Sequence, residues 1–172
     1  MKTNTLFGFV PVSIVALALG ISVLRIPGHN YISINASEFG PRTEECFQLY
    51  SPWELVGDLN CFPYMYAAIH VPDGVTITKV TFYWKDGANG SDGIVTLIRN
   101  NLDGTATNLV DVLTNGDAGV PSSSSTTASI VVDNSQYTYY LMKGFAQPTI
   151  SLYGVVVEYT YPLYLPFIKL MP

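Results

Sequence analysis

The sequence is short of charge and of basic residues. Lysine, arginine, aspartate and glutamate make up only 12% of its 172 residues, about half of the ~25% usual in a soluble domain. The thirteen acidic residues outnumber the eight basic ones, giving a net charge of −5, and this balance argues against nucleic-acid binding. Disorder is also excluded, because 48% of the residues are hydrophobic. These features predict a single β-rich domain that faces the cell envelope.

Common catalytic motifs are absent as well. The two histidines are His29 and His70, and His70 lies in an apolar strand pattern that is more typical of a structural residue than of a base. There is no G-x-S-x-G elbow, P-loop or G-x-G-x-x-G. Glu44 and Glu45 are adjacent, and no two carboxylates form the spaced pair that a glycosidase needs. We therefore predict no enzyme activity and no cofactor.

The longest hydrophobic run covers residues 6–24, which carry no charge. As a helix these residues would span about 28 Å, close to the thickness of a bilayer core. A small-x-small cleavage pattern at Ala16–Ala18 is followed by further apolar residues, so residues 1–28 are a signal anchor or a signal peptide, and we favour an uncleaved membrane helix. The remainder is then exported, either anchored on the extracytoplasmic side or secreted.

The two cysteines, Cys46 and Cys61, fit an exported address. In an oxidising compartment such an isolated pair is expected to form a disulfide. Two reduced, buried thiols are the alternative. Two cysteines and two scattered histidines lack the spacing of a zinc site.

Beyond residue 28 the pattern is that of strands separated by turns. Runs rich in Val, Ile, Thr, Tyr and Phe alternate with Asp-Gly and Asn-Gly turns. Without helices between them, these runs predict an antiparallel β-sandwich or jelly roll over residues 29–160. Alternation predicts core faces at Val80, Phe82 and Trp84 and at Val155, Val157 and Tyr159. The predicted strands are 31–35, 46–50, 64–71, 76–85, 94–100, 108–113, 128–132, 136–142 and 149–161.

One stretch has low complexity. Residues 121–127, PSSSSTT, are rich in serine, and such a composition predicts a flexible surface loop inside the single domain.

Several segments resemble a group of secreted or cell-envelope bacterial β-sandwich proteins of unassigned function. They are VPDGVTITKVTFYWKDGANG, VTLIRNNLDGT, VDNSQYTYYL and LYGVVVEYT, within residues 66–160. The resemblance implies a sandwich fold and an exported address, and it implies no catalytic residues.

Two binding sites are worth weighing from the residues alone. Asp86, Asn89 and Asp92 place oxygen ligands in a glycine-rich loop, which suits calcium, although turns use the same residues for backbone reasons and the turn interpretation is preferred. Exposed aromatic residues could stack on a glycan or contact a partner. The candidates for such a contact are Trp53, Tyr64, Tyr66 and Tyr139.

The C-terminal residues 161–172 are apolar and hold three prolines. Proline cannot donate to a sheet, so this tail is no central strand. We expect it to dock on a partner chain or on the membrane surface; folding back over the sandwich's own edge is the alternative. The docking residues would be Leu163, Tyr164, Leu165, Phe167 and Ile168.

Low charge and tyrosine-rich strands suit burial against other molecules. The sequence therefore predicts a non-catalytic extracytoplasmic structural or accessory subunit that acts through protein contacts, in a homo-oligomer or a larger membrane complex. The alternative is a carbohydrate-binding surface module.

Overall fold

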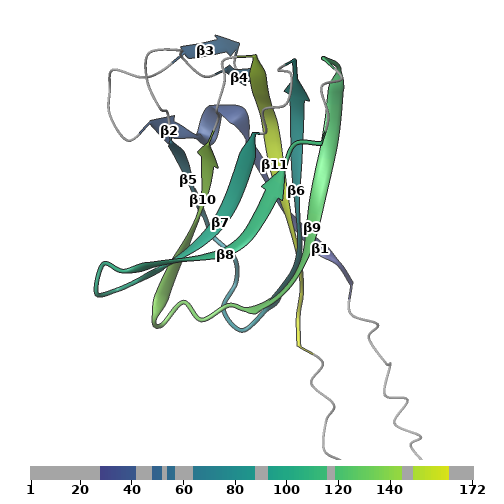
Figure 1. Ribbon diagram of the computed structural model, residues 1–172. Helices are drawn as coiled ribbons and strands as arrows, with labels where there is room; N and C mark the ends of the chain where they lie inside the picture. Colours follow the sequence, from purple (N-terminus) through teal and green to yellow (C-terminus); the bar gives the residue numbers. More distant parts are fainter. Residues whose placement is uncertain are drawn as a thin grey trace, which may run out of the picture.

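The protein is a sandwich of two antiparallel β-sheets (Figure 1). The computed structural model describes residues 28–41, 48–51, 54–56, 64–87, 93–115, 119–144 and 149–162. Sheet A contains, in order, β3 (Gln48–Ser51), β4 (Glu54–Val56), β11 (Ile150–Thr160), β6 (Thr76–Asp86) and β9 (Pro121–Val131), and β1 (Asn30–Asn35) also pairs with β11. Sheet B contains β2 (Gly40–Pro41), β5 (Met65–Ile69), β10 (Tyr137–Gly144), β7 (Ile94–Asn101) and β8 (Ala106–Leu113). A short 3-10 turn, η1 (Ala36–Glu38), follows β1. The predicted all-β sandwich is confirmed.

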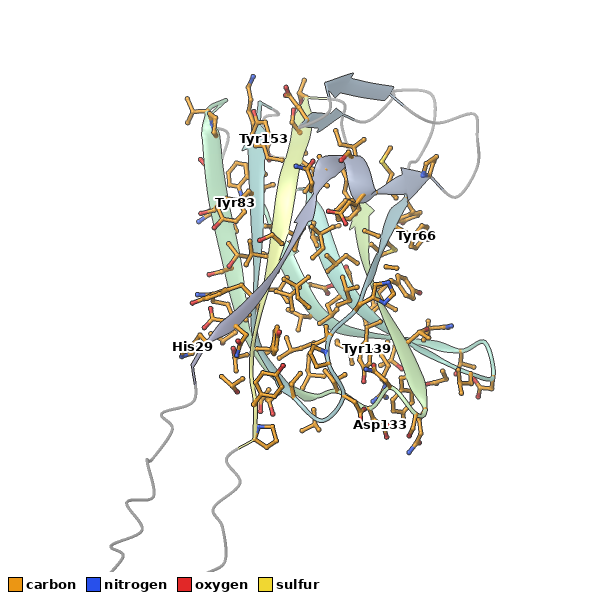
Figure 2. The ribbon with its side chains drawn as sticks, turned by 180° about the vertical axis from the view of Figure 1, so that it is seen from behind. His29, Tyr66, Tyr83, Asp133, Tyr139 and Tyr153 are labelled. Atoms are coloured by element: carbon orange, nitrogen blue, oxygen red, sulfur yellow. The ribbon has the colours of Figure 1, made fainter. Side chains whose placement is uncertain are left out.

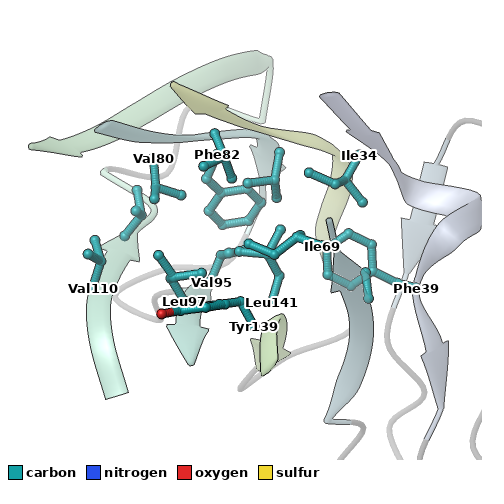
Figure 3. Packing of buried hydrophobic residues seen from close by; sticks show 14 of the residues in the cluster. Ile34, Phe39, Ile69, Val80, Phe82, Val95, Leu97, Val110, Tyr139 and Leu141 are labelled. Atoms are coloured by element: carbon teal, nitrogen blue, oxygen red, sulfur yellow. The ribbon is translucent and has the colours of Figure 1, made fainter. Parts of the chain in front are cut away.

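The inward faces of the two sheets form one hydrophobic core (Figure 3). Val80, Phe82 and Trp84 of β6 are all buried, as the alternation of the sequence predicts. Val155 and Val157 of β11 are buried beside them. Sheet B contributes residues such as Leu97 and Leu141, and burial of these side chains stabilises the sandwich at about 25 cal/mol per Å² of apolar surface.

Strand β9 corrects one expectation. Residues 121–127 do not form a flexible loop: they begin a strand that pairs with β6 at the edge of sheet A. Alternate residues of β9 are exposed and half-buried, and the inward Ser124 accepts a hydrogen bond from Trp84 Nε1 at 3.1 Å. An edge strand tolerates serine at these positions because only part of its inward face is covered, and Pro121 stands at the first residue, where a missing donor is harmless.

The edge of β11 opposite β6 is divided between two strands. β4 pairs with Ser151 and Leu152, while β1 pairs with the residues from Gly154 to Tyr159. β1 therefore begins, and β11 ends, at the same end of the sandwich (Figure 1).

The predicted N-terminal helix lies outside the described residues. Within the described part of the chain, no helix has the length and hydropathy needed to cross a membrane.

Candidate functional site

The outward face of sheet A carries a hollow of about 610 Å³. Its centre is one row of residues that runs across four strands. Asn35 of β1 lies opposite Gly154 of β11, Gly154 lies opposite Tyr83 of β6, and Tyr83 lies opposite Ser123 of β9. Residues that are paired in this way project from the same face of a sheet. The row therefore places an amide, an aromatic ring and a hydroxyl on one face of the sheet, with Gly154 between the amide and the ring.

The hollow exists because the neighbours of Tyr83 are small. Gly154 has no side chain and Ser123 has a short one, so neither covers the tyrosine ring from its neighbouring strand. Tyr83 is accordingly 44% exposed although it lies in the middle of a long strand. This order of small, large and small residues leaves the ring available for contact with a ligand.

Gly154 is required by its surroundings as well. A Cβ atom at this position would lie 2.9 Å from the carbonyl oxygen of Ile34, in the neighbouring strand β1. A distance below 3.0 Å forces the backbone to move, so the glycine allows β1 and β11 to approach closely.

Tyr153 enters the hollow next to Gly154. A register shift between Leu152 and Gly154 interrupts the pairing of β11 with β6 at this point, and such an irregularity changes the direction of a side chain. Both Tyr153 and Tyr83 line the hollow, and both are seen on the same side of the molecule in Figure 2. Partial burial, followed by the nearby Glu54 carboxylate, raises the pKa of the Tyr153 phenol. The phenol hydroxyl can both donate and accept hydrogen bonds.

The wall of the hollow on the β1 side is held by a capping box. The backbone N–H of Asn35 donates to Glu38 Oε1 at 2.8 Å, and the backbone N–H of Ser37 donates to Asn35 Oδ1 at 3.1 Å. This reciprocal pattern fixes both side chains at the start of η1. The Asn35 Nδ2 group makes no hydrogen bond within the described chain, which leaves its two N–H donors available at the wall.

An ion-pair cluster lies two rows further along the same face. Glu158 of β11 contacts Lys79 of β6, with Nζ and Oε2 3.0 Å apart, and it also contacts His29 Nδ1. The hydrogen bond and charge of Lys79, and then His29, hold the pKa of Glu158 below its ordinary value. The cluster ties the start of β1 to the sheet.

The aromatic residues expected to make contacts lie in several different places. Trp53 falls outside the described residues. Tyr64 is half exposed, while Tyr66 packs against Tyr140 on the outward face of sheet B, with ring centroids 5.7 Å apart. The expectation that Tyr139 is an exposed contact residue is wrong. Alternation along β10 turns it inward, where it is 4% exposed and its hydroxyl accepts a hydrogen bond from the Asp133 N–H at 3.1 Å (Figure 2).

The calcium candidate is only partly described. Asp86 is buried at the end of β6, where its Oδ2 accepts a hydrogen bond from Thr114 Oγ1 at 2.7 Å. Asn89 and Asp92 lie outside the described residues. Among the residues that are described, no group of three His, Cys, Asp or Glu side chains is arranged to hold a metal ion.

Two further expectations fall outside the described part of the chain and stay predictions. One is the disulfide between Cys46 and Cys61. The other is the docking tail, with Leu163, Tyr164, Leu165, Phe167 and Ile168.

Sequence reasoning missed Tyr83 and Tyr153 as site residues. Alternation from the buried Phe82 and Trp84 does place Tyr83 on the outward face. Its cross-strand neighbours cannot be read from the sequence, because the serine-rich composition of residues 121–127 predicts a loop. The sequence therefore does not show that Tyr83 pairs with Ser123, whose small side chain leaves the tyrosine ring exposed to solvent.

No protein-family model matches the chain, and no curated protein matches it. Among solved structures, the chain is similar to the C-terminal CBM6 of the laminarinase LamC from Zobellia galactanivorans, with 10% identity, a TM-score of 0.44, and coverage of 74% of this chain and 98% of that one. It is also similar to the carbohydrate-binding module CBM6cm-2 of Cellvibrio mixtus lichenase 5A, with 8% identity, a TM-score of 0.48, and coverage of 77% and 98%.

A third similar structure is the CBM36-1 domain of a xylanase from the hindgut metagenome of Trinervitermes trinervoides, with 8% identity, a TM-score of 0.48, and coverage of 79% and 100%. All three are carbohydrate-binding modules rather than envelope subunits. This finding corrects the main functional expectation from the sequence, a structural or accessory subunit that acts through protein contacts.

Proposed function

We propose that the protein is a carbohydrate-binding surface module and that the hollow on the outward face of sheet A is its binding site. The observation that carries the proposal is the row of Asn35, Gly154, Tyr83 and Ser123, with Tyr153 beside it. A sugar ring has an apolar face of C–H groups and an edge of hydroxyls. The row offers aromatic surface for the first and hydrogen-bonding groups for the second.

The dimensions of the hollow suit a short segment of a polysaccharide. Its volume of about 610 Å³ lies within the ~300–1,000 Å³ of typical ligand sites. From β1 to β9 there are three strand spacings of about 4.8 Å, roughly 14 Å in all. Because the side chains come from paired strands, the site is largely formed before the ligand arrives, which lowers the entropic cost of binding.

The direct test is retardation of the full-length protein in native gels that contain soluble polysaccharides, with Tyr83→Ala as the site variant. Tyr66→Ala is the matched control, since it removes a tyrosine from the opposite sheet. Loss of the Tyr83 ring should weaken binding about tenfold or more, equivalent to ~1.4 kcal/mol or more. Tyr66→Ala should bind as the parent protein does. Absence of retardation by every polysaccharide, or equal effects of the two variants, would contradict the proposal.

A carbohydrate-binding module of this kind acts where polysaccharide is present. We therefore also propose that the domain works outside the cytoplasm, at the cell surface or after secretion, in keeping with the hydrophobic N-terminal run.

A further inference from the structure

The charges around the hollow are unevenly placed. Among the residues that line it, Glu38 is the one charged side chain; the others offer hydroxyls, an amide, two phenols and apolar atoms. A ligand in the hollow therefore meets one negative charge and no positive charge within its walls.

The Glu38 carboxylate is held in place. Its Oε1 accepts the backbone N–H of Asn35 at 2.8 Å as part of the capping box, so the side chain cannot swing away without leaving that donor unpaired. The other oxygen of the Glu38 carboxylate can accept hydrogen bonds but has no proton to donate. A sugar hydroxyl can donate to such an oxygen, whereas a second carboxylate or a sulfate is repelled by it.

The lysines of the same face do not offset this charge. Lys79 lies two rows away and its Nζ is 3.0 Å from Glu158 Oε2. Lys85 lies on the far side of Tyr83, opposite Pro121, and is outside the lining of the hollow. The protein as a whole carries a net charge of −5, which adds a weak long-range repulsion of anions.

We infer that the hollow selects neutral polysaccharides and rejects acidic ones, with Glu38 as the residue that sets this specificity. The inference rests on the proposed function of the hollow. Glu38 would serve as an acceptor for a hydroxyl of a neutral sugar and as a barrier to uronic acids and to sulfated sugars.

The experiment compares one polymer in two forms. The neutral polysaccharide that retards the full-length protein most strongly is converted to its carboxymethyl derivative, and separately to its hydroxyethyl derivative at the same degree of substitution. The hydroxyethyl form controls for bulk. We expect the apparent Kd for the carboxymethyl form to exceed that for the hydroxyethyl form by about tenfold or more.

The Glu38→Gln variant tests whether the charge of Glu38 causes the difference between the two Kd values. Glutamine keeps an oxygen acceptor for the Asn35 N–H and removes the charge, so the ratio of the two Kd values should fall severalfold. Lys85→Gln removes a lysine of the same face that lies outside the lining of the hollow, and it should leave the ratio at its parent value or raise it.

The salt dependence of the Kd ratio distinguishes the effect of the Glu38 charge in the hollow from the effect of the net charge of the whole molecule. A repulsion that acts over long range fades at 0.5 M NaCl, where the Debye length is only ~4 Å. A Kd ratio that Glu38→Gln leaves unchanged and that salt abolishes would overturn the assignment to Glu38.

The two proposals fail in different ways. Preferential binding of the carboxymethyl form would overturn the inference on neutral ligands while the carbohydrate-binding function stands. If neither neutral nor acidic polymers retard the protein, the proposed function and the inference both fall.

Discussion

On the outward face of sheet A, Tyr83 lies between Gly154 and Ser123, whereas on the outward face of sheet B, Tyr66 lies against Tyr140. In the first case the cross-strand neighbours are too small to cover the ring. In the second case two rings meet at an interplanar angle of 59°, and each covers part of the other. The two sheets thus carry tyrosines in similar positions with different consequences.

The comparison shows that the size of the neighbouring side chains decides whether a tyrosine ring on a strand is covered or exposed. An aromatic pair gains about 0.5–1.5 kcal/mol beyond its burial, so Tyr66 and Tyr140 serve the stability of sheet B. Tyr83 forms no such aromatic pair with any residue that the structure describes, so it lacks this additional stabilisation. In the proposed function, the exposed ring of Tyr83 gains its contact from the bound polysaccharide.

The largest effect on this comparison is expected from Gly154→Ala. The new methyl group would meet the Ile34 carbonyl oxygen at 2.9 Å, so β1 must shift away from β11. Overpacking of this kind typically costs about 1–3 kcal/mol, which thermal unfolding would report as a lower Tm. Binding should weaken as well, because β1 carries the Asn35 wall of the hollow.

Gly40→Ala is the matched control, because a Cβ atom there meets nothing within 4 Å. It should leave the Tm within a degree or two. Equal losses of stability in the two variants would show that the close approach of β1 and β11 is unimportant.

Ser123→Phe would make the face of sheet A resemble that of sheet B. The new ring would lie opposite Tyr83 in the register and cover it, so binding of the glycan should fall about tenfold. Stability should be kept or slightly raised, since phenylalanine has a higher strand propensity than serine and would pack against the Tyr83 ring. Polysaccharide retardation and thermal unfolding measure the two effects.

Ser125→Phe controls for the added bulk, since Ser125 lies opposite Thr81 on the same face. It should bind as the parent protein does. If it abolished binding to the same extent, the site would not be centred on Tyr83.

A smaller effect is expected from pH, through the cluster at the other end of the face. Lys79 and His29 hold the pKa of Glu158 below its ordinary value. A group with a lowered folded-state pKa stabilises the protein above the unfolded-state pKa of about 4.3, and that stability is lost as the pH falls through the folded-state value. The Tm of the parent protein should therefore fall more steeply between pH 5 and pH 3 than that of Glu158→Gln. Lys79→Gln should give an intermediate slope, and identical slopes would show that the ionisation of Glu158 does not contribute to stability in this pH range.

Much of the sandwich could be predicted from the sequence. The burial of Val80, Phe82 and Trp84 follows from strict alternation in a strand. The pattern failed at residues 121–127, because an edge strand needs few hydrophobic residues and serine-rich composition is also typical of loops.

The site could be predicted far less well. A site that spans paired strands depends on the register, and the register between β6 and β9 joins residues some forty positions apart. Alternation showed that Tyr139 and Tyr140 face opposite sides, but it could not tell which of them is inside. In the folded protein Tyr139 shares the buried face of β10 with Leu141, and its hydroxyl accepts a hydrogen bond from the Asp133 N–H.

Tyrosine iodination with peptide mapping, in the presence and absence of a saturating polysaccharide, tests most directly whether the hollow on sheet A is the binding site. Tyr83 is 44% exposed, and Tyr31, Tyr64 and Tyr161 are exposed to 61%, 50% and 51%, so all four should react in the free protein. We predict that the polysaccharide protects Tyr83 and leaves the other three reactive. Protection of Tyr64 with Tyr83 still reactive, or protection of none of them at saturation, would contradict the account.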